Sequence, residues 1–371
     1  MEQREQAHSV ELMLNMGPQH PSTHGVFRMV LWIDGEQVVD VEPYIGYLHR
    51  GSEKLCEGET YQQIVTLFDR LDYVSNFNNE LALCLAVEKL MGVEVPERAE
   101  YIRVILAELN RVASHLLFMG TFGLDAGAMT PVMYAFRGRE RVQAVFEAVT
   151  GARMMHNFCR IGGVKEDLPE DFDARMARVL PELRRDLETV DGLLTFNEVL
   201  LARTRGIGAI GAEEAMGYGM TGPCLRACGV AYDVRRAQPY GVYDRLRFDV
   251  PVGTQGDCWD RYFVRVAEAY QSLDIIEQAL REVPPGPVLN PQVRRLPRPP
   301  RGEAYARAEN PRGEIGVFVV SDGTDKPYRL KVRPPSFCNL SALRRLLQGA
   351  YVADAVVILG SLDIVLGEVD R

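Results

Sequence analysis

Clustered cysteines are absent from this chain of 371 residues. The seven cysteines stand at positions 56, 84, 159, 224, 228, 258 and 338, an odd number spread over the whole sequence. Disulfide frameworks belong mainly to short secreted chains, and zinc or iron-sulfur sites need clustered ligands. Only Cys224 and Cys228 lie close together, and two small buried residues explain that pair. We expect no disulfide framework and no metal cluster held by this chain alone.

Long uncharged apolar runs and an excess of positive charge are also missing. The run LALCLAVEKLMGV contains Glu88 and Lys89, and the closing AVVILGSLDIVLGEV contains Asp363, so neither gives the roughly 20 apolar residues of a membrane span. The first eleven residues are polar and acidic, unlike a secretory signal. The net charge of minus nine provides no broad basic surface for nucleic acid. We therefore expect a cytoplasmic chain that can dock onto a membrane protein.

The composition that is present, with 47% hydrophobic and 25% charged residues, is that of a globular protein. Alternating residues at 10–17, 26–34 and 36–45 predict a small antiparallel sheet. The period then lengthens to that of helices at 60–70, 71–92, 96–125, about 130–150, 169–203 and 257–281. Residues 284–301 contain seven prolines and cannot form regular structure, and short strands follow at 302–310, 314–323 and 327–336 before a closing helix or two.

These patterns predict an α+β fold that is mostly α. Residues 1–51 form an N-terminal antiparallel β region that carries the HPSTHG loop, and residues 52–283 form a central helical bundle. Residues 284–371 form a proline-rich strap, a second small β region and a C-terminal segment. We expect one integrated domain without internal repeats.

A glycine-rich stretch, RGIGAIGAEEA, places Gly206, Gly208 and Gly211 in the spacing of a dinucleotide-binding fingerprint. That fingerprint requires a preceding strand and a following helix within a βαβ unit. The preceding LLTFNEVLLARTR has helical character, and no parallel-sheet pattern surrounds it. We interpret the stretch as a turn between helices.

The loop GPQHPSTHG, residues 17–25, contains two histidines between prolines. His20 and His24 could bind a metal, but no third ligand is evident nearby. They could instead satisfy backbone groups in a structural loop. A third interpretation is proton or hydrogen-bond chemistry, because the unperturbed histidine pKa of about 6.5 allows exchange near neutrality.

Two further segments have both a structural and a functional interpretation. FDRLDY, residues 68–73, would in the structural interpretation hold an exposed Asp69 and Arg70 pair and a half-buried Tyr73 near the start of a long helix. Asp125, in LDAGAMTP, follows an apolar run at a helix end, where aspartate is common beside glycine and proline. Local patterns alone do not assign either segment a function.

Taken together, several segments resemble the family of the D subunit of NADH-quinone oxidoreductase, the peripheral component of respiratory complex I that is related to the large subunit of nickel-iron hydrogenases. The matching stretches run in order from residue 15 to residue 371. They are NMGPQHPSTHGVFR, PYIGYLHRGSEKL, the text at 60–90, ELNRVASHLLFMGTFGLDAGAMTP, RIGGVKEDLP and ILGSLDIVLGEVDR. The resemblance implies a fold like that of the hydrogenase large subunit.

The hydrogenase relatives hold nickel and iron with one front motif, ERxCGxC, and one rear motif, DPCxxC. Residues 69–75 of this chain read DRLDYVS and residues 363–368 read DIVLGE, so all four cysteines are replaced. Loss of the thiolates excludes a nickel-iron centre on ligand chemistry. The resemblance implies instead a cavity at the former metal position that receives a quinone headgroup, so we predict no metal ligands in this chain.

Reduction of a quinone takes two electrons and two protons, so hydrogen-bonding groups must lie at its carbonyl oxygens. By the resemblance, His24 and Tyr73 are the headgroup partners and catalytic residues. Asp125 matches the family aspartate that pairs with this histidine, which would favour the imidazolium. Proton loss from His24 would then leave Asp125 with a weaker partner, a charge change that could couple to proton pumping.

The resemblance also implies an electron supply outside this chain. No cofactor is expected on the chain alone: quinone is the substrate, an iron-sulfur cluster lies in a partner subunit, and NADH is oxidised elsewhere in the complex. Arg50 and Arg70 match family arginines near that cluster. Many relatives have a histidine where this chain has Met155, and His156 would point about 100° away on a helix, so the role of that histidine is in question here.

The implied partners are the B and I iron-sulfur subunits, the C subunit and the H membrane subunit of complex I. The implied location is peripheral, on the cytoplasmic side of the cell inner membrane. One alternative is the same subunit in a quinone-reducing complex fed by ferredoxin or another donor. A second is a scaffold without an active site, against which the joint presence of His24, Tyr73 and Asp125 speaks. The type of quinone, ubiquinone or menaquinone, is not encoded in these motifs.

Overall fold

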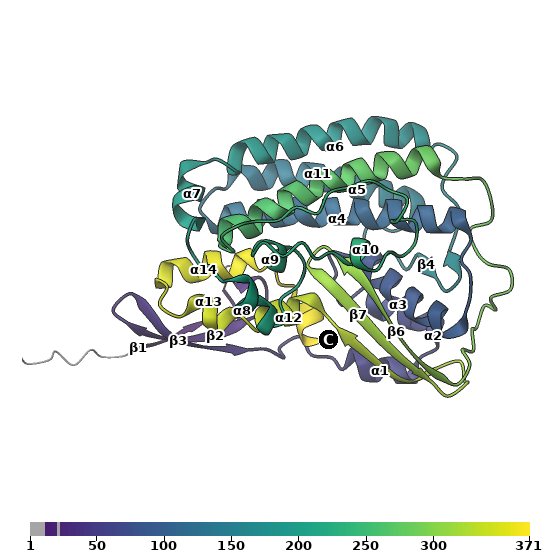
Figure 1. Ribbon diagram of the computed structural model, residues 1–371, viewed down its shortest axis with the longest axis horizontal. Helices are drawn as coiled ribbons and strands as arrows, with labels where there is room; N and C mark the ends of the chain where they lie inside the picture. Colours follow the sequence, from purple (N-terminus) through teal and green to yellow (C-terminus); the bar gives the residue numbers. More distant parts are fainter. Residues whose placement is uncertain (1–11, 21–22) are drawn as a thin grey trace, which may run out of the picture.

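The computed structural model describes residues 12–20 and 23–371. Figure 1 shows long helices stacked along one side, a small sheet that extends from one end, and a second sheet against the opposite end of the helices. The expected α+β fold, mostly α with antiparallel sheets from both ends of the chain, is confirmed.

The N-terminal sheet has the order β1 (Leu12–Met16), β2 (Arg28–Asp34) and β3 (Gln37–Tyr44), all antiparallel. Its register pairs Met16 with Met29 and Leu31 with Val41. In β2 the consecutive residues Met29, Val30 and Leu31 are all buried, and in β3 Val38 and Val41 are buried between exposed or half-buried neighbours. The expected first strand begins at residue 10, and its first two residues lie outside the described part of the chain.

The helices of the first half and the two long helices that pack with them form the bundle. They are α1 (Ser52–Gly58), α2 (Tyr61–Phe68), α3 (Asn76–Met91), α4 (Glu97–Asp125), α5 (Thr130–Thr150), α6 (Phe172–Leu194) and α11 (Cys258–Glu282). At 1.5 Å per residue, α4 is about 43 Å long, and it packs against α3, α5, α11 and α14. Because neighbours surround it, α4 is buried on nearly every side, including polar residues that must find partners inside the protein.

Short elements connect the long ones. They are β4 (Cys159–Arg160), β5 (Gly163–Val164), α7 (Glu198–Thr204), α8 (Ala212–Gly217), α9 (Gly222–Arg226) and α10 (Val234–Ala237). The helix expected over 169–203 is two helices, because the Asn197 side chain accepts hydrogen bonds from the backbone of Val199 and Leu200 and starts α7 anew. The stretch with Gly206 and Gly208 is the predicted turn between α7 and α8.

The last part of the chain, residues 284–371, consists of an irregular stretch, a second sheet and four short helices. The proline-rich residues 284–301 contain no helix or regular strand and run along β5, where Val164 N–H donates to Val288 O. The strands β6 (Gly302–Asn310), β7 (Gly313–Ser321) and β8 (Pro327–Arg333) form an antiparallel sheet, as predicted. Four helices close the chain: α12 (Pro335–Leu340), α13 (Leu343–Leu347), α14 (Val352–Ser361) and α15 (Leu366–Asp370).

The closing helices hold the N-terminal sheet to the bundle. Helix α13 packs on β3, α14 packs on α4, and Gly349 N–H donates to Val38 O. Residues from both ends of the sequence therefore meet at one place, next to the end of α4 (Figure 1). None of the described helices is both long and apolar enough to pass through a membrane.

Candidate functional site

His24 lies in the compact connection between β1 and β2. The Thr23 hydroxyl donates to His20 O at 2.8 Å, and His20 pairs with Gly25 in an isolated bridge. His24 has a backbone φ of 54°, in the left-handed region where few residues other than glycine are found. Pro21 and Ser22 lie outside the described residues. Left-handed backbone at a non-glycine residue persists only where its surroundings enforce it, and such residues cluster at functional sites.

The His24 side chain meets Asp125, the last residue of α4. Nε2 of His24 lies 2.9 Å from Oδ2 of Asp125, and their side chains are 18% and 11% exposed. The two atoms are at ion-pair distance but are not aligned as a hydrogen bond, and neither has another aligned partner among the described residues. Each of these two buried atoms therefore has the other as its close polar partner among the described residues.

Gly360 of α14 packs directly against the His24–Asp125 pair. A Cβ atom at position 360 would lie 2.8 Å from Asp125 Oδ2 and 3.3 Å from His24 Nε2. Only a residue without a side chain permits this approach. The imidazole and the carboxylate thus lie directly against the backbone of α14.

Tyr73 lies in the turn between α2 and α3 and is half-buried, as expected. The helix expected over 71–92 begins only at Asn76, so Tyr73 precedes it. Burial raises the pKa of the Tyr73 phenol, and the neighbouring Asp72 adds to the effect. The hydroxyl is therefore held in its protonated, hydrogen-bond-donating form at neutral pH.

The front segment 69–75 and the rear segment 363–368 come together in space. A Cβ at Gly367 would lie 2.5 Å from Leu71 O and 3.2 Å from Cδ1 of Tyr73. A Cβ at Gly25 would lie 3.2 Å from Cδ1 of Leu366. One strip, residues 360–367, therefore supports the His24–Asp125 pair at one end and Tyr73 at the other.

Behind Tyr73 is a buried cluster of acids that sequence reasoning did not single out as functional. Arg312, in the turn between β6 and β7, donates to Asp72 Oδ2 at 2.9 Å and to Asp363 Oδ1 at 3.2 Å. Glu368 of α15 accepts the Ser336 N–H at 2.9 Å. Asp72 and Glu368 stand at two of the four positions where the hydrogenase relatives have cysteines. This correspondence was the one feature of the sequence that could have marked them as functional residues.

Arg50 and Arg70 lie near each other. Burial and the charge of Arg70 lower the pKa of Arg50. Arg50 donates to Ser52 Oγ and Arg70 to Thr66 O, and within the described residues neither forms an ion pair with a carboxylate. Two adjacent uncompensated cations would favour a negatively charged group beside them.

The expected exposed pair of Asp69 and Arg70 is wrong. Asp69 is buried, its Oδ2 accepts the Asn157 N–H at 3.1 Å, and Arg70 points to solvent. Asp69 instead links the front segment to the loop at 151–158.

Met155 and His156 lie in that loop, not on a helix as expected. Met155 Sδ lies 3.5 Å from Nδ2 of Asn76, whereas the His156 ring stacks on Phe77 with centroids 4.4 Å apart. Burial lowers the pKa of His156 to about 4, so it is neutral at physiological pH. Met155 faces the front segment, and His156 belongs to the aromatic core.

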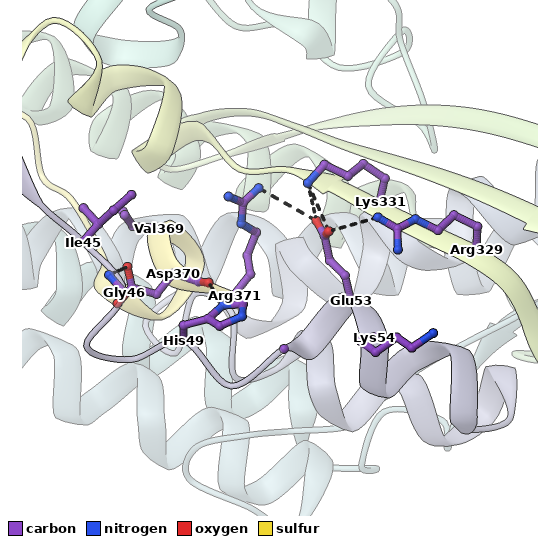
Figure 2. A pocket seen from close by; sticks show the side chains of 11 residues that line it. Ile45, Gly46, His49, Glu53, Lys54, Arg329, Lys331, Val369, Asp370 and Arg371 are labelled. Carbon is purple, nitrogen blue, oxygen red and sulfur yellow. Dashed lines mark hydrogen bonds and ion pairs between the residues drawn. The ribbon is translucent and has the colours of Figure 1, made fainter.

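A surface pocket of about 340 Å³ lies beside Arg50, between the loop at 45–51, α1, β8 and the last three residues. Figure 2 shows Glu53 at its centre, with Arg329, Lys331 and Arg371 directed toward the carboxylate. Neither His24, Tyr73 nor Asp125 lines this pocket. It is a cation-rich surface next to the site and not the space between the predicted headgroup partners.

Asp233, Glu268 and Glu309 form a second buried acid group whose oxygens lie within 4.8 Å of one another. Such a triad could hold a metal ion, but guanidinium groups already contact it. Arg235 Nη2 lies 2.7 Å from Asp233, and Arg226 bonds both Glu268 and Glu309. These arginines supply the positive charge that a cation would bring.

The seven cysteines are free thiols without disulfide partners, and Cys224 and Cys228 are buried, as expected.

Comparison with known proteins gives full-length matches. A family model described as "Respiratory-chain NADH dehydrogenase, 49 Kd subunit" matches residues 125–299 and 292–371. The chain is 51% identical to the D subunit of NADH-quinone oxidoreductase from Carboxydothermus hydrogenoformans over 97% of this chain and 98% of that protein. It is 50% identical to the D subunit from Clostridium beijerinckii over 100% of both chains. The protein of the same name from Geotalea uraniireducens is also 50% identical, over 98% of this chain and 100% of its own length.

Proposed function

Because the chain belongs to the family of the 49 kDa subunit of respiratory-chain NADH dehydrogenase, a component of NADH-quinone oxidoreductase, we propose that it forms the quinone headgroup site of that complex. The observation that carries the proposal is the strip at residues 360–367, which supports both the His24–Asp125 pair and Tyr73. A headgroup between the two would meet an imidazole at one carbonyl oxygen and a phenol at the other.

The chemistry of these groups suits quinone reduction. Each carbonyl oxygen becomes more basic as electrons arrive, so a donor at each end stabilises the product and supplies its protons. Tyr73 presents a protonated phenol on an aromatic body that can pack against an apolar headgroup. Asp125 compensates positive charge on His24 and orients its ring.

Electrons would reach the quinone from an iron-sulfur cluster of a partner subunit, with NADH oxidised elsewhere in the complex. The adjacent cations Arg50 and Arg70 fit such a negatively charged neighbour, because neither forms a close ion pair with a carboxylate of the described residues. We propose the B iron-sulfur subunit at this face, with the C subunit, the I iron-sulfur subunit and the H membrane subunit as further partners. The chain would be peripheral on the cytoplasmic side of the cell inner membrane, with the quinone tail entering through the membrane subunit.

The same subunit could act in a complex that takes electrons from ferredoxin or another donor. The proposed headgroup chemistry is identical in both cases, because the donor is oxidised elsewhere. Electron transfer from NADH to quinone in the purified complex distinguishes the two.

Substitution of the two headgroup partners tests the proposal. Tyr73→Phe and His24→Ala should each lower quinone reductase activity of the assembled complex by about a hundredfold, the lower range for general acid catalysis. Reduction of an artificial acceptor by NADH, which bypasses the quinone site, should stay near the unmodified rate.

Tyr328→Phe is the matched control, because Tyr328 is 70% exposed and lies on β8, outside the proposed site. Quinone reduction at the unmodified rate by both Tyr73→Phe and His24→Ala would show that the headgroup lies elsewhere.

A further inference from the structure

Three acids and two arginines share the buried space behind Tyr73. Arg312 bonds Asp72 and Asp363, and Arg265 of α11 lies 3.6 Å from Asp363. Glu368 completes the set, and its side chain is fully buried. These groups come from the front segment, the turn after β6, α11 and the two ends of the rear segment.

The balance of positive and negative side chains indicates that one acid in this cluster keeps its proton. Three carboxylates against two guanidinium groups would bury one uncompensated negative charge, which costs several kcal/mol or more. A buried acid in such a position retains its proton instead. The cluster is neutral only when one of its three acids is a carboxylic acid.

Glu368 is the acid that holds this proton. Asp72 and Asp363 each bond a guanidinium group, whereas Glu368 has no ion pair within the described part of the chain. Its carboxyl group is hydrogen-bonded by Ser336 alone, through the backbone N–H to Oε1 at 2.9 Å and through the serine side chain, and no guanidinium group bonds it within the described residues. Burial, with the nearby charge of Asp72, raises the pKa of Glu368 to about 8.

Glu368 lies next to the backbone that contacts Tyr73. Gly367, the preceding residue, packs against the Tyr73 ring and the Leu71 carbonyl. Ser336 of α12 bonds Glu368, and the groups close enough to interact with it electrostatically are Asp72 and Tyr73 from the front segment, Arg312 from the β6–β7 turn and Cys338 from α12. Among them, the Tyr73 phenol is the neighbour that also faces the proposed quinone.

We propose that Glu368 is the proton reserve of the site and resupplies Tyr73 after each quinone reduction; this inference rests on the proposed function. When the quinone accepts two electrons supplied from NADH, the Tyr73 O–H bond breaks as one quinol O–H bond forms. The Glu368 carboxyl then gives its proton to the phenolate and becomes a carboxylate. A proton from water later restores the neutral acid, and the His24 side supplies the second proton of the quinol.

The pH profile of quinone reduction in the assembled complex tests this role. In the unmodified complex, kcat should fall above about pH 8, where the reserve empties. Glu368→Gln keeps the shape of the neutral acid but carries no transferable proton. It should lower kcat by about tenfold at neutral pH, and the fall in kcat above pH 8 should disappear. Glu368→Asp restores an acid in the same place and should recover part of the rate.

Two controls separate this role from a structural one. NADH oxidation with an artificial acceptor reports assembly and should be unchanged in both Glu368 variants. Glu100→Gln is the matched substitution, because Glu100 is also largely buried with an unpartnered Oε2, but lies in the first turn of α4, at the opposite end from Asp125. Its kcat and pH profile should equal those of the unmodified complex.

An infrared difference spectrum between oxidised and reduced complex provides a direct readout. The carbonyl stretch of a protonated carboxyl group should change on quinone reduction in the unmodified complex and be missing in Glu368→Gln. Should Glu368→Gln not assemble, Glu368→Asp should shift this band, and an unchanged spectrum would overturn the inference.

The outcomes distinguish this inference from the proposed function. If Tyr73→Phe is slow while Glu368→Gln keeps the unmodified kcat and pH profile, Glu368 is no proton reserve and the quinone site stands. If both variants reduce quinone at the unmodified rate over the whole pH range, both the reserve and the site are wrong.

Discussion

At the scale of single residues, the site depends on what two glycines leave out. Gly360 and Gly367 bring the backbone of the C-terminal segment against the His24–Asp125 pair and against Tyr73. The His24–Asp125 pair and Tyr73 therefore pack directly against backbone that carries no side chain. A single added methyl group would occupy the space that their present positions require.

Gly360→Ala should therefore impair quinone reduction without unfolding the protein. The new Cβ would lie 2.8 Å from Asp125 Oδ2, so the pair must move, and small displacements of catalytic groups cost roughly tenfold to a hundredfold in rate. The measurement is kcat of the assembled complex. Gly192→Ala in α6, where no atom lies within 4 Å of the new Cβ, should leave kcat unchanged and add up to about 1 kcal/mol of stability.

A double substitution shows whether Gly360 acts through the pair. In the Asp125→Ala background the obstructed carboxylate is gone, so Gly360→Ala should cost no further activity. Additive losses would mean that Gly360→Ala acts through a group other than Asp125, such as His24, whose Nε2 would lie 3.3 Å from the new Cβ.

The proton on Glu368 should also appear in the pH dependence of stability. Its pKa is about 8 in the folded chain against an ordinary value of about 4.5, so unfolding releases a proton between these values. The free energy of unfolding therefore falls as the pH rises from about 4.5 to about 8. Glu368→Gln removes this loss: its melting temperature should match the unmodified protein near pH 4.5 and exceed it at pH 8. A difference that does not grow with pH would contradict a raised pKa.

At the scale of elements, the Glu53 side chain makes several of the contacts that attach α1 to the rest of the protein. Glu53 accepts a hydrogen bond from Lys331 Nζ at 2.8 Å (Figure 2) and one from the Val332 N–H at 3.1 Å, both on β8. Arg371 lies 3.8 Å away on the third side. This attachment sets the start of α1 and, with it, the loop that carries Arg50.

Glu53→Ala should reduce the free energy of unfolding by about 1–2 kcal/mol, because a charge-assisted bond to a partly buried backbone N–H is lost. Urea denaturation measures the change. Glu57→Ala is the control, since its partners Lys54 and Arg329 are exposed, and exposed pairs contribute about 0–1 kcal/mol. Equal losses of unfolding free energy in the two variants would show that the bonds of Glu53 to β8 stabilise the protein no more than an exposed ion pair does.

Elements were predictable from the sequence where one local pattern decides them. Alternation located β2 and β3, prolines marked the irregular strap at 284–301, and apolar periodicity located α4 and α11. The break between α6 and α7 was missed, because a single cap by Asn197 overrides a continuous helical pattern.

The candidate site was predictable only in part. The resemblance supplied His24, Tyr73, Asp125, Arg50 and Arg70, and the structure brings His24 and Asp125 into contact. The support from Gly360 and the bond between Arg312 and Asp72 join residues more than 200 positions apart. No local pattern encodes such contacts, because they arise only when the two ends of the chain pack together.

At the scale of the whole molecule, a second network of buried charges joins the bundle to the C-terminal sheet. Glu108 of α4 accepts hydrogen bonds from Tyr243, Ser272 of α11 and Arg235 of α10. Burial alone would raise the pKa of Glu108, but Arg111 and Arg235 lower it to about 2. This network joins α4, α10, α11 and the loop that carries Tyr243.

Glu108→Gln should cost about 3–5 kcal/mol of stability at neutral pH, because it leaves buried arginines uncompensated. The pKa of Glu108 is lowered in the folded chain, so its contribution is fully present above about pH 4.5 and is lost as the pH falls toward 2. The difference in unfolding free energy between the two proteins should therefore shrink on acidification. Glu97→Gln, which affects only an exposed pair with Arg245, should change stability by less than about 1 kcal/mol at any pH.

The contact between the two ends of the sequence also has a consequence for synthesis. Asp370 accepts the N–H groups of Gly46 and Leu48, and Gly360 and Gly367 complete the surroundings of His24 and Tyr73. The ribosome makes the histidine and the tyrosine early and residues 360–370 near the end of the described chain, and contacts between distant positions form late in folding. A half-made polypeptide thus already contains the imidazole, the phenol and the aspartate, but it lacks the backbone that spaces them.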